Sequence, residues 1–203
     1  WARRHRAFLQ TGVDGIWNDL NEPEEMGKDW PSDVKYGFDG RPVDHRRTSP
    51  QYSLIQAEMS YDILRKHRPR QRPYVISRGG YAGIQRCAAL WTGDNRSDWT
   101  NDFRRNIPMG LSMSICGNPH NGHDIGGFFG HPRFEDPVDP ELYVRWMQAG
   151  IFNPFCRQHH DGFGSNPRMP RPFTEPWRFG PEIETICRRS QDEMKILSLA
   201  DLS

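Results

Sequence analysis

Short apolar runs alternate with polar loops and amphipathic stretches along the chain, and this rhythm predicts alternating strands and helices. The apolar runs that we interpret as strands are residues 15–19, 73–77, 87–91, 111–116 and 151–156. Strands that alternate with helices form βαβ units and a parallel sheet. The chain is therefore predicted to have an α/β fold.

Apolar positions three and four residues apart predict helices between these strands. Ser49 with Pro50 is typical of a helix start, and the helical stripe that follows ends before Pro69. Its apolar positions are Leu54, Ala57, Tyr61 and Leu64. Further helices are expected over residues 98–106, 140–147, where Asp139 would be the N-cap, and 183–197.

Each predicted strand, or the loop after it, leads to a charged side chain. These residues are Asp19, Arg78, Asp94, Asp124 and Arg157. In a parallel barrel the carboxyl ends of the strands open on one face, where active sites lie. We therefore predict a partial (β/α)8 TIM barrel with about its last five strands, since a complete barrel has eight strands and about 250 residues. A doubly wound open sheet is the rival, but no glycine-rich phosphate loop follows the first strand.

The charge balance argues against two classes of partner. Twenty-seven Lys and Arg residues face 26 Asp and Glu residues, so the net charge is +1 and no general basic field attracts nucleic acid or an anionic membrane. The basic run over residues 65–72 is interpreted as a solvated helix end. No apolar run reaches the length of a membrane span. Aromatic residues make up 12% of a chain whose mean hydropathy is −0.85, a mixture that suits aromatic clefts for sugars.

The cysteine and histidine patterns do not predict a metal site or a disulfide framework. The four cysteines are widely spaced and include no CxxC pair. Four histidines, His120, His123, His159 and His160, lie in loops. Loop histidines without a third ligand set do not form the fixed pair that a helical HExxH presents. We expect no metal and no cofactor.

Two aspartates at strand ends match the needs of glycoside hydrolysis. Because side chains alternate along a strand, Trp17 and Asp19 share one face. Asp94 follows Trp91 at the end of another strand. Cleavage of a glycosidic bond uses two carboxyl groups, which stand about 5–5.5 Å apart when the product retains its anomeric configuration. A strand-end aspartate that only caps its loop is the simpler alternative for each position.

Four segments together resemble glycoside hydrolase family 31, the α-glucosidase and α-xylosidase family. They read "GIWNDLNEP", "SRGGYAGIQRCAALWTGDN", "GHDIGGF" and "FNPFCRQHH", occur in the order of the family's motifs, and span roughly residues 10–160. The resemblance implies that residues 1–203 are the C-terminal portion of a catalytic barrel, without its N-terminal strands and flanking β domains. The chain starts with Trp1 rather than Met, which agrees with a piece of a longer protein, and alone it is expected to be inactive.

The resemblance also implies residue roles. Asp19 would be the nucleophile that forms a covalent glycosyl-enzyme, and Asp94 would be the general acid/base. A guanidinium such as that of Arg78 would favour the ionised nucleophile. The implied substrate-binding residues are Trp17, Leu20, Asn21, Glu22, Arg78, Trp91, Asp124, Phe128, Arg157 and His159. Within this set, Asn21 and Glu22 are interpreted as residues that orient the others.

The expected activity is that of a retaining, exo-acting α-glycosidase on an oligosaccharide or α-glucoside. His123 before Asp124 resembles α-xylosidases, whereas His159 after Arg157 resembles α-glucosidases, so xylose remains an alternative to the favoured glucose. A transglucosylase shares the same intermediate. The alternative from another class is a catalytically inactive carbohydrate-binding relative. Localisation and oligomeric state are not predicted.

Overall fold

The computed structural model describes residues 2–25, 28–29, 31, 33–38, 40–129, 138–160 and 175–200. The chain forms two compact units, Trp1–Trp91 and Thr92–Ser203, which are described one at a time. Within the described ranges, no helix combines the length and the apolar character that crossing a membrane requires.

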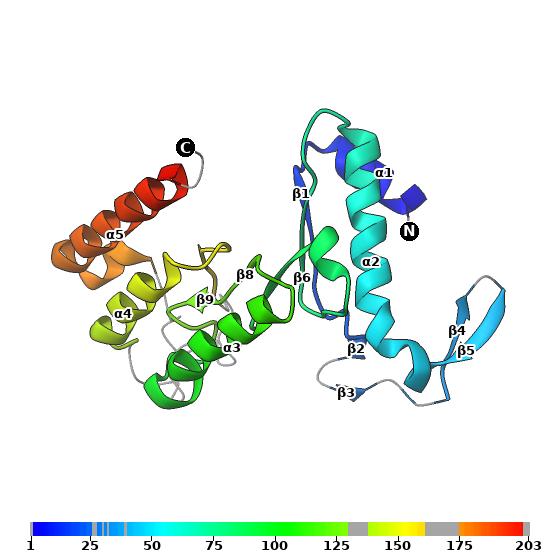
Figure 1. The fold of residues 1–203 in the computed structure, drawn as a ribbon, viewed down its shortest axis with the longest axis horizontal. Helices are drawn as coiled ribbons and strands as arrows, with labels where there is room; N and C mark the ends of the chain where they lie inside the picture. Colours follow the sequence, from blue (N-terminus) through cyan, green and yellow to red (C-terminus); the bar gives the residue numbers. More distant parts are fainter. Residues whose placement is uncertain are drawn as a thin grey trace, which may run out of the picture. The chain divides into compact units, whose positions relative to one another are not determined.

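Three parallel strands form the sheet of the first unit, and the labelled strands β1 and β6 lie side by side in Figure 1. β1 (Gly15–Asn18) pairs with β6 (Tyr74–Ser77), and β6 pairs with β7 (Ala89–Trp91). The register sets Trp17 opposite Ile76 and Asn18 opposite Ser77. These strands fall where the apolar runs predicted them. They confirm the α/β class, although the strands of the described ranges do not close into a barrel.

Two helices accompany this sheet, and one begins earlier than predicted. α1 (Ala2–Gln10) contacts α2 (His45–His67), and α2 packs on β1 and β6. The predicted start at Ser49 is wrong: the N-cap is Asp44, whose carboxylate accepts a hydrogen bond from the Arg46 amide at 3.1 Å. Pro50 therefore lies inside the helix. The helix ends before Pro69, as predicted.

The segment between β1 and α2 contains short strands. β2 (Glu24–Glu25) pairs antiparallel with β3 (Lys28–Asp29), and β4 (Lys35–Phe38) pairs antiparallel with β5 (Arg41–Asp44). A 3-10 turn, η1 (Ile84–Arg86), connects β6 to β7.

The second unit begins with a helix that overrides one predicted strand. The π-helical turn η2 (Trp99–Phe103) continues into α3 (Arg104–Ile115), so the strand predicted over residues 111–116 is wrong. Alternating apolar residues and serines there suggested a strand. In the helix, Ser112 and Ser114 donate to the carbonyls of Pro108 and Gly110. Serine hydroxyls can form such hydrogen bonds inside a helix, so the alternation of apolar residues with serines does not distinguish a strand from a helix.

The strand predicted over residues 151–156 is also wrong. α4 (Pro140–Gly150) starts after its predicted N-cap, Asp139. The amides of residues 151–153 donate to carbonyls of the last turn of α4, so these residues form turns and not a strand. Phe152 is accordingly 72% exposed. The strand of this region is β10 (Arg157–Gln158), which pairs in parallel with β9 (Asp124–Ile125).

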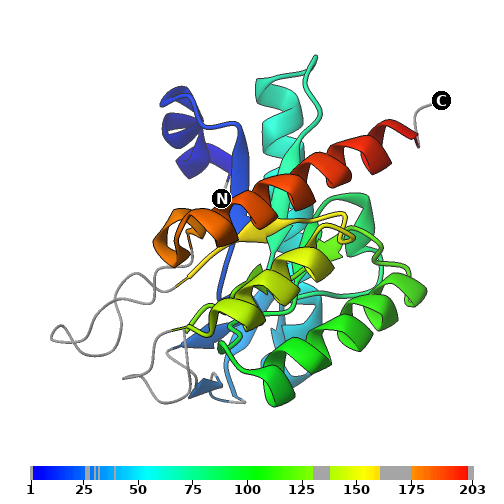
Figure 2. The same cartoon turned by 90° about the vertical axis from the view of Figure 1, so that its left-hand side faces the viewer.

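The core of the second unit lies between α4, β9 and α5 (Pro181–Ala200), which follows the 3-10 turn η3 (Pro176–Phe179). Figure 2 shows α4 and α5, which pack against each other. The buried core residues are Ile125, Val138, Leu142, Tyr143, Trp146, Met147 and Cys187. The four cysteines are free thiols.

Loss of the Asp139 carboxylate should destabilise this unit. Asp139 accepts from the Glu141 amide at 2.9 Å and from Nε1 of Trp99 at 2.8 Å, so it caps α4 and ties it to η2. Asp139→Ala in the protein that contains this chain is expected to lower the free energy of unfolding by about 1–2 kcal/mol. Denaturant unfolding measures it. Glu141→Ala, which removes an exposed carboxylate from the same turn, should cost less than about 0.5 kcal/mol. Equal costs would contradict the capping role.

Candidate active site

The end of β1 separates a buried face from an exposed one. Ile16 and Asn18 are buried, and Asn18 accepts a hydrogen bond from Ser60 of α2 at 3.1 Å. Trp17 is 42% exposed on the other face. Asp19 follows on the face of Trp17, and its side chain is 48% exposed. A carboxylate is thus presented to solvent directly beyond a buried strand.

Leu20 turns the chain immediately after Asp19. Its φ of 53° is positive, which a leucine rarely adopts, and it is the single such non-glycine residue in the described ranges. In this conformation the Leu20 amide donates to Oδ1 of Asp19 at 2.9 Å. Strained backbone of this kind costs about 1–3 kcal/mol and concentrates at functional sites. The turn therefore helps to fix the Asp19 carboxylate.

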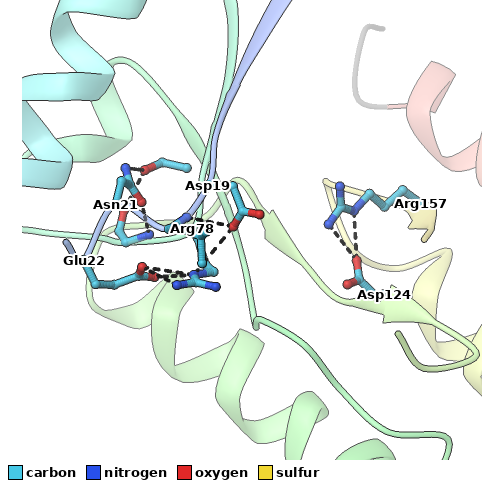
Figure 3. A network of polar contacts seen from close by, with 9 residues as sticks. Asp19, Asn21, Glu22, Arg78, Asp124 and Arg157 are labelled. Atoms are coloured by element: carbon cyan, nitrogen blue, oxygen red, sulfur yellow. Dashed lines mark hydrogen bonds and ion pairs between the residues drawn. The ribbon is translucent and has the colours of Figure 1, made fainter. Parts of the chain in front are cut away.

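Arg78, the residue after β6, joins the carboxylates of this site (Figure 3). Its Nε and Nη2 each lie 2.9 Å from Glu22, one on each carboxylate oxygen. Its Nε also lies 3.6 Å from Oδ1 of Asp19. The side chain of Arg78 is only 13% exposed, so this bidentate pair with Glu22 is held in place by its surroundings.

Asn21 ties the ends of β1 and β6 together (Figure 3). Its Nδ2 donates to the Ser77 hydroxyl at 2.8 Å, and its Oδ1 accepts from the Gly79 amide at 2.7 Å. A Cβ at Gly79 would lie 2.8 Å from Cβ of Ser53, so no larger residue fits there. Asn21 is 1% exposed, and its position is that of an orienting residue.

The two tryptophans predicted to wall the site lie together in the first unit. Trp17 and Trp91 make an edge-to-face contact with ring centroids 5.6 Å apart. Trp91 is 3% exposed, whereas Trp17 keeps a large accessible surface. Trp91 therefore supports Trp17, whose ring is the more exposed of the two.

Asp94 lies in the second unit, in a loop bounded by hydrogen bonds. Nδ2 of Asn95 donates to the Thr92 hydroxyl at 3.1 Å, and the Phe129 amide donates to the Asn95 carbonyl at 2.9 Å. Asp94 itself is exposed. It lines a cleft of about 360 Å³ together with Arg96, Asp98, Asn101, Asp102 and Phe129.

Four further predicted residues meet as two pairs in the second unit. The β9–β10 register sets Arg157 opposite Asp124, and Nε and Nη2 of Arg157 lie 2.9 and 2.8 Å from Oδ1 of Asp124 (Figure 3). Asp124 is fully buried, so this charge is stabilised by its arginine. Phe128 stacks on His159 with ring centroids 5.2 Å apart.

His123 has a structural role that the sequence did not reveal. It is 2% exposed; its Nδ1 accepts from Nε1 of Trp146 at 2.7 Å, and its Nε2 lies 2.7 Å from the Asn153 amide. Burial lowers the pKa of His123 to about 4. A neutral ring that accepts at Nδ1 carries its proton on Nε2. That Nε2–H can donate to the side-chain amide oxygen of Asn153 when the amide is oriented with its oxygen toward the ring.

Both ring nitrogens of His123 are thus engaged, directly before Asp124 in the chain. Among the residues that the structure describes, no group of three or more His, Cys, Asp or Glu side chains is arranged to hold a metal ion.

The comparisons with known proteins identify the family. The model of the glycosyl hydrolases family 31 TIM-barrel domain matches residues 1–193. The chain therefore belongs to glycosyl hydrolase family 31, and its fold is that family's TIM barrel in part.

Individual relatives agree with this assignment. The chain is 36% identical over 192 residues to alpha-glucosidase 2 of Bacillus thermoamyloliquefaciens, covering 93% of this chain and 22% of that protein. It is 38% identical over 182 residues to the probable glucan 1,3-alpha-glucosidase of Oryza sativa, covering 86% of this chain and 18% of that protein. The chain thus spans about a fifth of the length of these relatives.

Solved structures show the same likeness. A GH31 dextranase of Flavobacterium johnsoniae, complexed with glucose, superposes with a TM-score of 0.78 at 31% identity, covering 96% of this chain and 23% of that one. The family 31 alpha-glucosidase of Bacteroides thetaiotaomicron gives a TM-score of 0.74 at 32% identity, with 96% and 29% covered.

The buried, neutral His123 should make stability depend on pH. An unfolded histidine has a pKa of about 6.5, so below that pH the unfolded chain binds a proton that the native ring refuses. The free energy of unfolding should therefore fall by on the order of 3 kcal/mol as the pH drops from about 6.5 to about 4. Denaturant unfolding at several pH values measures this. His123→Gln should remove this part of the slope; an unchanged slope in the variant would refute the assignment.

Proposed function

We propose that the protein containing this chain is a retaining, exo-acting α-glycosidase that hydrolyses terminal α-linked glucose. The observation that carries the proposal is the end of β1, where the half-exposed Asp19 carboxylate is fixed by the Leu20 amide and lies near Arg78 in a chain of family 31. Exposed Trp17 on the same face offers an aromatic surface to the apolar side of a sugar ring.

In the first step Asp19 acts as nucleophile. An Asp19 oxygen attacks the anomeric carbon while the bond from that carbon to the leaving oxygen breaks, and Asp94 gives its proton to that oxygen. The product is a glycosyl ester on Asp19. Arg78 lies beside the nucleophile, and the pair with Glu22 keeps its guanidinium in place.

In the second step Asp94 acts as base. Its carboxylate takes a proton from water, the water oxygen attacks the anomeric carbon, and Asp19 leaves as a free carboxylate. Two inversions give net retention. The mechanism requires the two aspartates to stand about 5–5.5 Å apart. If a sugar hydroxyl takes the place of water, the same intermediate transfers its glucose to that sugar, which is the reaction of a transglucosylase.

The innermost sugar would be bound by residues of the second unit. The Asp124–Arg157 pair offers charged hydrogen-bonding groups, and the stacked Phe128 and His159 offer a flat surface with a polar edge. The names of relatives, which are alpha-glucosidases, support glucose rather than xylose as the proposed sugar. The alternatives are an α-xylosidase and an inactive carbohydrate-binding relative. Assays with an aryl α-glucoside and an aryl α-xyloside separate them, because an α-xylosidase cleaves the xyloside and an inactive relative cleaves neither.

Removal of the nucleophile should abolish turnover and leave sugar binding. Asp19→Ala in the full-length protein is expected to reduce kcat on an aryl α-glucoside by on the order of 10⁴-fold or more. Calorimetry with glucose checks that the pocket survives. Asp14→Ala, which removes an exposed aspartate five positions before Asp19, serves as the control and should keep its activity. Substantial turnover by Asp19→Ala would reassign the nucleophile.

Removal of the acid should depend on the leaving group. Asp94→Ala is expected to lower kcat/KM by about 10²–10⁴-fold on a disaccharide, whose leaving oxygen needs a proton, and far less on an activated nitrophenyl glucoside. The two substrates are compared in one enzyme preparation, so misfolded protein affects both equally. Equal losses on the two substrates would exclude Asp94 as the acid.

A further inference from the structure

The loop that carries Asp94 is hydrogen-bonded to a residue of the following helical turn. The Arg96 amide, two residues after Asp94, donates to Oδ2 of Asp102 at 2.7 Å. A carboxylate acceptor makes this bond shorter and stronger than a bond between neutral groups. Asp102 belongs to η2 and lines the same cleft as Asp94.

The π-helical form of η2 explains how Asp102 reaches that amide. The Phe103 amide donates to the Asp98 carbonyl at 2.9 Å, five residues back, so this turn contains one residue more than an α-helical turn. The Asp98 carboxylate caps the turn by accepting from the amides of Thr100 and Asn101 at 2.8 and 2.6 Å. Such turns are rare and occur frequently at functional sites.

A glycine packs closely against the backbone of the same loop. Gly127 has a φ of +89°, and a Cβ on it would lie 2.5 Å from the Ser97 amide nitrogen and 2.7 Å from the Arg96 carbonyl carbon. The loop is therefore packed against the backbone at residue 127 and bonded to Asp102. Its position is set by two independent contacts within the second unit.

We propose that Asp102 is a positioning residue that acts through the Arg96 amide to fix the loop of the acid/base Asp94. This inference depends on the proposed function of Asp94. A proton donor must lie within hydrogen-bond reach of the leaving oxygen, and a misplacement of about 1 Å can cost on the order of 10²-fold in rate. Asp98 caps the turn, so the capping of η2 does not itself require Asp102.

The test compares Asp102→Ala, Asp102→Asn and the control Glu184→Ala in the full-length protein. Glu184 pairs with Arg188 in α5, so the control removes one carboxylate from the same unit that takes no part in the loop contacts. For Asp102→Ala we expect kcat/KM to fall about tenfold on a disaccharide and less than about twofold on an activated nitrophenyl glucoside. Asp102→Asn keeps an oxygen acceptor and should recover most of the loss.

Two results would overturn the proposal. One is a loss of equal size on both substrates, which denotes a purely structural role; the other is no loss on either. If Asp102→Ala does not fold, Gly127→Ala displaces the same loop with Asp102 intact and should show the same dependence on the leaving group. Asp94→Ala, measured in parallel, separates the two claims: if it shows the dependence and the other variants do not, only the role of Asp102 fails.

Discussion

The junction between the carboxyl ends of β1 and β6 is the constraint on which the proposed chemistry depends. Asn21 bridges the Ser77 hydroxyl and the Gly79 amide, and Arg78 holds Glu22 through hydrogen bonds from its Nε and Nη2. Asp19 lies between the end of β1 and Asn21 in the sequence and is itself held by the Leu20 amide. A nucleophile attacks efficiently only when its geometry is set before the substrate arrives, and these contacts set it.

In the second unit, the proposed catalytic residue Asp94 is positioned in a different way. Asp94 follows a strand by three residues and lies in a loop, so the hydrogen bonds of Asn95 and of η2 replace the support that a sheet gives directly. Asp124 is positioned by strand register, which sets it opposite Arg157. The proposed acid/base thus depends on a helical turn, whereas Asp124 and Arg157, which are proposed to bind sugar, depend on β9 and β10.

The sequence was sufficient for the features that follow from local pattern. The runs ending at Asp19, Ser77 and Trp91 are largely apolar and bounded by polar loops, and they form the predicted strands. Residues 111–116 misled because their alternation also fits a helix whose serines bond to the preceding turn. The burial of His123 depends on Trp146 and Asn153, which are distant in the sequence, and no local pattern marks the positive φ of Leu20 or the π turn of η2.

Covalent trapping of the intermediate tests the central claim most directly. A fluorinated α-glucosyl fluoride forms a glycosyl ester that hydrolyses slowly, and peptide mass spectrometry then locates the sugar. We expect a single labelled carboxylate, Asp19, with labelling blocked by excess glucose. A label on any other residue, or steady turnover without a covalent species, would contradict it.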